Sequence, residues 1–422
     1  MGAVYLFGPI WMRCNPRVVK GKLLVKVFTK LAGKPMSPTL LHRKLSTSAI
    51  ADIYTKVMEG KRLSFDDGVR LWKHPSLTDV GALANLVRET KNGNDTFYVR
   101  NQHINYSNIC NKGCKFCSFY AQKGGPDPYR MTMDDVRAKL ERTKHLPVTE
   151  IHMVAGIDKK LPYQYYLDLL DTVHAIRPDA HIKAFTMVEL IHIQSIAGKP
   201  MTEMLLELKA HGLASLPGGG AEILTDRVHD LLFQRKETAA EWLETAKTAH
   251  RAGLPTNATM LYGHIETVEE RTIHLMKLRE AQDETGGFFT FIPLAFSSPG
   301  TQLEHIPPTT GELDLRVIAI SRLMLDNFPH IKAFWMMCTP PVAQSAQWYG
   351  ADDIDGTIVT YTITHEIDKD SDSQNLSQQK LVEMILEAGR DPVERDAHYN
   401  RIVRDDSSTL VAKKQLPLPM AH

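Results

Sequence analysis

Cysteine is scarce in this chain, with five among 422 residues. A secreted protein held together by disulfides would carry more of them, in even number and spread along the chain. Here three fall within eight residues, at Cys110, Cys114 and Cys117. Clustered thiols favour metal binding in a reducing compartment, so we expect a cytoplasmic protein.

Long apolar runs are also missing. No stretch of about 18 apolar residues occurs, so the sequence predicts no transmembrane helix and no stable membrane insertion. The net charge of +1 gives no argument for a nucleic-acid partner. A hydrophobic fraction of 43% is ordinary for a globular protein, and a chain of this length buries a large core without disulfides.

Acidic residues are absent from the first 51 positions, whereas residues 1–50 contain nine Lys or Arg. The remainder of the chain carries 41 basic and 49 acidic residues. We therefore interpret residues 1–45 as a basic, poorly ordered extension outside the folded domain. A membrane-surface amphipathic helix and an organelle transit peptide are alternatives, and a signal peptide is disfavoured because the apolar stretch is short.

The middle of the chain alternates between two patterns. Apolar, β-branched runs predict strands at 97–99 with 104–106, 151–154, 181–186, 214–216, 257–261, 288–292, 331–335 and 354–359. Helical patterns lie between them at 132–145, 163–177, 189–211, 225–252, 267–285, 310–328 and 342–349. Capping boxes are expected at Thr132 with Asp135, Thr238 with Glu241, Thr267 with Glu270 and Thr309 with Glu312.

Eight strands separated by helices predict an α/β protein, a (βα)8 barrel of the TIM type, over residues 96–365. A helical segment at 46–95 precedes the barrel, and a helical tail at 366–422 follows it. In such a barrel the chemistry lies at the carboxyl ends of the strands, so the loops after the strands are the place to look for a site.

The clustered cysteines form a C-x3-C-x2-C run in the loop after the first predicted strand. Thiolates are suitable ligands for iron–sulfur clusters. A cubane has four irons and this loop offers three thiolates, so one iron stays open to an external ligand. Gly113 permits the tight backbone that such a short loop needs. A structural zinc site is the alternative, but it would take four ligands, and Cys14 and Cys338 are isolated.

The cysteine run, with an aromatic residue at Phe116, resembles the signature of the radical S-adenosylmethionine (SAM) superfamily. From about residue 50 to 405, the chain is similar to the branch that serves menaquinone biosynthesis by the futalosine pathway and deazaflavin-cofactor biosynthesis. The similarity rests on the segments 103–106, 216–222, 262–267, 282–288, 325–332 and 350–357.

This resemblance implies a 4Fe–4S cluster on Cys110, Cys114 and Cys117, with SAM as a co-substrate. It also implies that the 5′-deoxyadenosyl radical adds to 3-[(1-carboxyvinyl)oxy]benzoate, giving 6-amino-6-deoxyfutalosine, methionine and bicarbonate. A flavodoxin- or ferredoxin-type protein would donate the electron. Segments 325–332 and 350–357 favour this reaction over those of sister enzymes, a cyclase that abstracts hydrogen from a nucleoside and a deazaflavin-cofactor synthase. A non-catalytic iron–sulfur electron-transfer protein is the alternative of another class.

Further site residues are expected at the strand ends. Ala155 stands where relatives usually have glycine, and a plain strand end is the alternative interpretation of that segment. For Glu189, which we expect to bind the ribose hydroxyls, the alternative is a carboxylate that favours a helix N-terminus. The residues that the resemblance assigns to SAM binding are Phe116, Phe119, Ala155, Gly156, Glu189 and Glu222.

Three residues are candidates for catalysis: His103, His264 and Glu266. For a lone histidine, a packed or capping role is the alternative. The substrate has two carboxylates, which require cationic or N–H donors. The candidate donors are Arg279, Arg322, Lys332 and His264. An acidic run at Asp352, Asp353 and Asp355 is interpreted as hydrogen-bonding residues near the last predicted strand, with metal binding as the alternative.

Overall fold

The computed structural model describes residues 40–121, 125–233, 237–359 and 376–404. Most of the predicted basic extension at 1–45, including Cys14, therefore lies outside the described residues. Positions 40–45 belong to helix α2 (Leu40–Ser46). Helices α3 (Ala51–Met58), α4 (Phe65–Lys73) and α5 (Leu77–Asn92) follow, and α5 packs against a helix of the barrel, α13 (Gly311–Met324).

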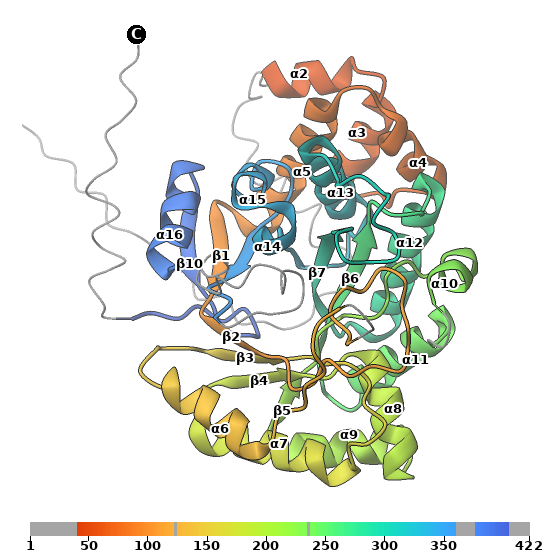
Figure 1. The fold of residues 1–422 in the computed structure, drawn as a ribbon. Helices are drawn as coiled ribbons and strands as arrows, with labels where there is room; N and C mark the ends of the chain where they lie inside the picture. Colours follow the sequence, from red (N-terminus) through yellow and green to blue (C-terminus); the bar gives the residue numbers. More distant parts are fainter. Residues whose placement is uncertain (1–39, 122–124, 234–236, 360–375, 405–422) are drawn as a thin grey trace, which may run out of the picture.

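A closed ring of parallel strands forms the centre of the protein (Figure 1). Its members are β1 (Asp95–Val99), β2 (Asn101–Ile104), β3 (Glu150–Met153), β4 (His181–Ala184), β5 (Leu213–Ser215), β6 (Thr256–Tyr262), β7 (Phe288–Ala295), β8 (His330–Ile331) and β9 (Asp353–Gly356). Only Arg100 separates β1 from β2, so these two count as one bent strand of eight.

Single bridges join the three sheets into the ring. Leu216 pairs with Thr256 between β5 and β6, and Lys332 pairs with Asp353 between β8 and β9. On the remaining side β9 pairs with β1, and Gln102 of β2 bridges to residue 359. The predicted (βα)8 barrel is therefore confirmed.

Helices cover the outside of the ring. They are α6 (Met133–Arg142), α7 (Tyr163–Ile176), α8 (Met187–Ala197), α9 (Met201–Ala210), α10 (Asp226–Leu232), α11 (Ala239–Arg251), α12 (Val268–Thr285), α13, α14 (Trp335–Cys338) and α15 (Pro340–Ala346). The capping boxes at Thr132, Thr238 and Thr267 are confirmed. The box at Thr309 is wrong, because Thr310 caps α13 by accepting from the backbone N–H of Leu313.

Two predicted helices are each divided into two. The pattern at 189–211 becomes α8 and α9, because Gly198 ends the first in a left-handed conformation (φ +64°) and Pro200 precedes the second. The pattern at 225–252 becomes α10 and α11. Within the described ranges, no helix combines the length and the apolar composition needed to cross a membrane.

The chain beyond the barrel returns to it. Helix α16 (Gln378–Glu387) lies in the predicted helical tail, and β10 (Asp391–Glu394), which we did not expect, pairs in parallel with β1. The sequence Asp-Pro-Val-Glu has low strand propensity, but Pro392 is tolerated because β10 lies at a sheet edge. Arg395 follows directly and is buried at the base of the barrel.

Strand alternation sends polar side chains into the ring. On β6, Asn257, Thr259 and Leu261 line an internal cavity, whereas the residues between them belong to the apolar core outside it. On β3, Glu150 and His152 line the same cavity. The ring therefore encloses a chamber in which these polar side chains stand among apolar ones such as Ile292, Leu294 and Phe296.

Candidate active site

The chamber has a volume of about 270 Å³. At the carboxyl ends of the strands it is walled by 116–119, from the cysteine loop, and by 217–220, from the loop after β5. Toward the amino ends it reaches Glu150 and Lys183, which lie on the short strands β3 and β4. It therefore runs from the expected cluster site down to a charged floor.

The cysteine loop is held by backbone hydrogen bonds to two neighbouring segments. The N–H of Lys115 donates to the carbonyl of Leu232 (3.0 Å), and the N–H of Asn111 donates to the carbonyl of Ile157 (3.2 Å). The N–H of Cys117 donates to the carbonyl of Cys114 (3.2 Å), and Gly113 has a φ of +64°, which suits glycine. The tight turn expected from the sequence is present.

The three cysteine side chains fit a cubane better than a single metal ion. All three are half-buried, and Cys117 borders the chamber. Among the described residues, no set of three His, Cys, Asp or Glu side chains converges on one ion. In a cluster each thiolate binds a different iron, so three thiolates on one loop are a suitable donor set, whereas a structural zinc site takes four ligands. Burial raises the pKa of Cys117 to about 11, so a positively charged partner is needed to hold it as thiolate.

Gly156 lies directly behind the cysteine loop. A Cβ at this position would come within 2.4 Å of the carbonyl oxygen of Ile109 and 3.0 Å of the Cβ of Cys110. The backbone of Ile109 and the side chain of Cys110 could move away from such a Cβ only if the cysteine loop shifted. Glycine is therefore required here by close approach.

We expect Gly156→Ala to displace the cysteine loop and to lower activity by about 100-fold, the cost of a misplacement of roughly 1 Å. Iron and sulfide content after anaerobic reconstitution should also fall. Gly311→Ala is the matched control, because its nearest neighbour, Val342, lies at an ordinary 3.4 Å. Equal iron content in both variants would show that the contact at Gly156 does not position the cluster ligands.

The backbone N–H groups of residues 155 and 156 already donate hydrogen bonds within the protein. The N–H of Gly156 donates to the carbonyl of Ser107 (2.8 Å), and the N–H of Ala155 donates to Glu189 Oε1 (3.2 Å). Neither residue lines the chamber. An ammonium group of a ligand would therefore have to meet carbonyl oxygens of this segment, and SAM binding here stays a prediction.

Glu189 acts as a helix cap in this structure. It accepts hydrogen bonds from the N–H of Thr186 (2.7 Å) and from the hydroxyl of Tyr106 (2.6 Å), and it completes the capping box of α8. Burial raises its pKa to about 7. The carboxylate also supports Ala155 and lies outside the chamber lining, so its role toward the ribose stays a prediction.

Besides Cys117, four of the residues predicted for SAM binding or catalysis border the chamber: His103, Phe116, Phe119 and Glu222. His103 stacks on His152 with ring centroids 4.6 Å apart, and burial lowers the pKa of both histidines, so both are neutral. Phe116 packs edge to face on Phe233.

The glycine-rich loop reaches the chamber by packing tightly on β6. A Cβ on Gly218 would lie 2.5 Å from the carbonyl oxygen of Asn257. Glu222 follows this loop with a φ of +43° and borders the chamber with its neighbours 217–220. The backbone can therefore approach a ligand closely here, as the sequence indicated.

His264 and Glu266 lie outside the chamber lining. His264 Nδ1 accepts from the N–H of Ile265 (2.7 Å), and its Nε2 donates to the carbonyl of Leu261 (3.0 Å). Glu266 accepts from the N–H of Gly263 (2.7 Å) and pairs with Arg271. Both side chains shape the loop after β6, which is the packed or capping alternative, and their catalytic role stays a prediction.

Of the predicted carboxylate-binding cations, Lys332 alone borders the chamber. Arg279 donates to the carbonyls of Leu63 and Met324, and Arg322 pairs with Asp352. A second lysine that borders the chamber was missed. It is Lys183, a charged residue inside an apolar strand, and that pattern could have drawn attention to it.

Comparison with known proteins gives two profile matches. The Radical SAM superfamily profile matches residues 104–277, and the CofH/MqnC C-terminal region matches residues 285–408. The aminodeoxyfutalosine synthase of Thermus thermophilus is 45% identical over 364 residues, covering 85% of this chain and 98% of the relative. The enzyme of the same name from Streptomyces coelicolor is 37% identical, covering 87% of this chain and 98% of the relative.

Two further matches are more distant. The cyclic dehypoxanthine futalosine synthase of Halalkalibacterium halodurans is 31% identical, covering 87% of this chain and 98% of the relative. Among solved structures, methylornithine synthase (PylB) superposes with a TM-score of 0.65 at 18% identity, covering 81% of this chain and 97% of that one. At this identity the structural match shows the fold alone.

Proposed function

Because this chain belongs to the radical SAM superfamily, in the branch that carries the CofH/MqnC C-terminal region, we propose that it is an enzyme that joins the 5′-deoxyadenosyl group of SAM to 3-[(1-carboxyvinyl)oxy]benzoate. The observation that carries the proposal is the 45% identity to an aminodeoxyfutalosine synthase across 98% of that relative. The cyclase of the same pathway is 31% identical over a similar span, which makes its reaction the second candidate.

The proposed reaction balances without an added oxidant. The S–C5′ bond of SAM breaks to release methionine, and the 5′ carbon bonds to the terminal vinyl carbon of the substrate. The aryl group then moves from the ether oxygen to the adjacent carbon. The enol carboxyl group leaves as bicarbonate after reaction with water, and the electron used to split SAM is returned. The product is 6-amino-6-deoxyfutalosine.

The residues of the chain have three tasks in this reaction. Cys110, Cys114 and Cys117 hold the 4Fe–4S cluster, which when bound supplies the electron that splits SAM. The loop 217–220 lets its backbone approach the nucleoside, and Phe116 with Phe119 excludes water from the reactive carbon. The barrel then holds the olefin within contact distance of the 5′ carbon.

The surroundings of the reaction are part of the same proposal. A flavodoxin- or ferredoxin-type protein is the proposed donor of the electron, because the cluster must be reduced before the first cleavage of SAM. A cytoplasmic location is proposed because thiolate ligands persist in a reducing compartment.

The test is anaerobic reconstitution followed by incubation with SAM, a chemical reductant and the carboxyvinyloxybenzoate. We expect one adenosyl adduct, identified by its mass, for each SAM consumed. Free 5′-deoxyadenosine formed stoichiometrically with dehypoxanthine futalosine would identify the cyclase instead. A reduced-cluster spectrum that does not change when SAM is added would support the electron-transfer alternative.

A further inference from the structure

The floor of the chamber carries charged side chains, although barrel interiors are normally filled by apolar layers. Lys183 pairs with Glu150 (Nζ–Oε2, 2.6 Å), and Lys332 pairs with Asp355 (Nζ–Oδ1, 3.1 Å). All four line the chamber, and none is more than 6% exposed. Burying two ion pairs is costly and adds little stability over apolar residues. These pairs therefore indicate a function beyond stability.

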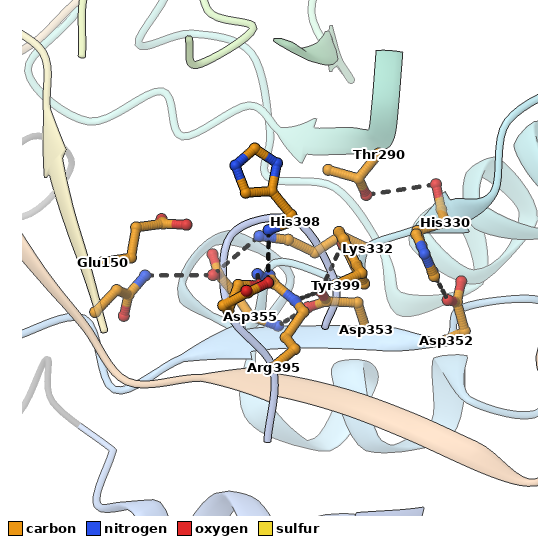
Figure 2. A network of polar contacts seen from close by, with 12 residues as sticks. Glu150, Thr290, His330, Lys332, Asp352, Asp353, Asp355, Arg395, His398 and Tyr399 are labelled. Carbon is orange, nitrogen blue, oxygen red and sulfur yellow. Dashed lines mark hydrogen bonds and ion pairs between the residues drawn. The ribbon is translucent and has the colours of Figure 1, made fainter. Parts of the chain in front are cut away.

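The segment after β10 fixes this floor from below (Figure 2). Arg395 donates to Asp353 (2.7 Å), and the hydroxyl of Tyr399 donates to the same carboxylate (2.7 Å). Asp353 in turn accepts from the backbone N–H of Asp355 (2.6 Å). Asp355 is thereby held in a left-handed conformation (φ +68°) beside Lys332.

Both ammonium groups retain donors for a ligand. An ammonium carries three N–H donors, and within the described ranges Lys183 and Lys332 each make one hydrogen bond. The cations of the floor also act together on Glu150. Burial alone would raise the pKa of Glu150, yet Lys183, Arg395 and Lys332 hold it well below its ordinary value. Each lysine is already matched by one carboxylate, so a further carboxylate would be held by the N–H donors that remain.

A third polar group, Asn257, borders the same chamber. Asn257 is 1% exposed and has an amide oxygen without a hydrogen-bond partner among the described residues. Rotating the amide by half a turn would present its NH₂ group instead. A buried amide left in this state indicates a missing hydrogen-bonding partner.

The position of the floor indicates which end of the proposed substrate it would contact. Cys117 borders the opposite end of the chamber, so the 5′ carbon of SAM and the olefin meet there. The ring carboxylate lies at the other end of the substrate. This inference rests on the proposed function: we propose that Lys183 and Lys332 form the subsite that binds this aromatic carboxylate, with Asn257 as a neighbouring donor.

The test compares two substrates that differ only in the ring carboxylate: 3-[(1-carboxyvinyl)oxy]benzoate and the same enol ether on an unsubstituted phenyl ring. The wild-type enzyme should prefer the carboxylate by about 10- to 100-fold in kcat/KM, the contribution of charge-assisted hydrogen bonds. In Lys332→Met and Lys183→Met this preference should fall below about threefold, through loss of turnover of the carboxylate substrate only.

Two further measurements separate binding from folding. The double variants Lys332→Met/Asp355→Asn and Lys183→Met/Glu150→Gln remove each pair without leaving a buried charge, and they should lose the same preference. Calorimetric binding of the carboxylate substrate to SAM-loaded enzyme without reductant should weaken by a similar factor. Lys247→Met is the matched control, because this lysine pairs with Glu284 on the outside of the barrel and should leave the preference intact.

Each other outcome has a separate meaning. An equal loss for both substrates in the double variants would overturn the subsite and leave a structural role. A loss of uncoupled SAM cleavage would assign the lysines to SAM, also against the inference. Wild-type enzyme that turns over both substrates equally would contradict the subsite alone. Wild-type enzyme that forms no adduct from either would contradict the proposed function instead.

Discussion

Replacing Cys117 by alanine should remove the iron–sulfur cluster and the cleavage of SAM. The side chain borders the chamber, and its loop has no fourth cysteine that could substitute for it. Loss of a residue that only supports a metal ligand costs about 10- to 100-fold in affinity or activity, so loss of the ligand itself should exceed about 100-fold. The measurement is iron and acid-labile sulfide per chain after anaerobic reconstitution, followed by methionine released from SAM.

Cys338→Ala provides the matched control. Cys338 is buried in α14 and lies outside the chamber lining. Its replacement should cost about 1 kcal/mol of stability and leave the iron content unchanged. If the two variants bind equal amounts of iron, the cluster is held elsewhere and the ligand assignment is wrong.

A second large effect is expected at the base of the barrel, where Arg395→Met should lower the free energy of unfolding by about 3–5 kcal/mol. The pair of Arg395 with Asp353 is completely enclosed, with side chains 1% and 0% exposed. Removing the guanidinium leaves the carboxylate facing Tyr399 without its charged partner. The shift in the midpoint of urea unfolding measures the loss.

Arg70→Met tests the same chemistry at the surface. Arg70 pairs with Asp52 at 2.6 Å, but both side chains are about half exposed. Water screens such a pair, so its loss should cost about 0–1 kcal/mol. Equal effects of the two substitutions would show that the pair at Arg395 contributes no more than a surface contact.

The parts of the fold that the sequence predicted depend on local patterns. Alternating β and α periodicities identify the barrel, and Thr132, Thr238 and Thr267 mark helix starts through contacts only three residues apart. β10 could not be found in this way. Its four residues have low strand propensity, and they pair only because β1, distant in sequence, offers an open edge.

The site was predicted unevenly for a related reason. The cysteine motif is recognised from its spacing, which is a property of one loop. The direction in which a side chain points depends on the whole barrel. The sequence therefore did not show that Lys183 lines the chamber, or that His264 and Glu266 fold back onto their own loop. The capping role of Glu189 was among the expected alternatives, but its contact with Tyr106 joins residues 83 positions apart.

The parallel pairing of β10 with β1 also sets the order in which the protein can be completed. The amino-terminal part of a chain is synthesised first, and contacts between distant segments form slowly. The strand that leads into the cysteine loop therefore lacks one neighbour until residues 391–394 have been made. Iron and sulfide loaded before that point would meet a barrel whose first strand is still uncovered on one edge.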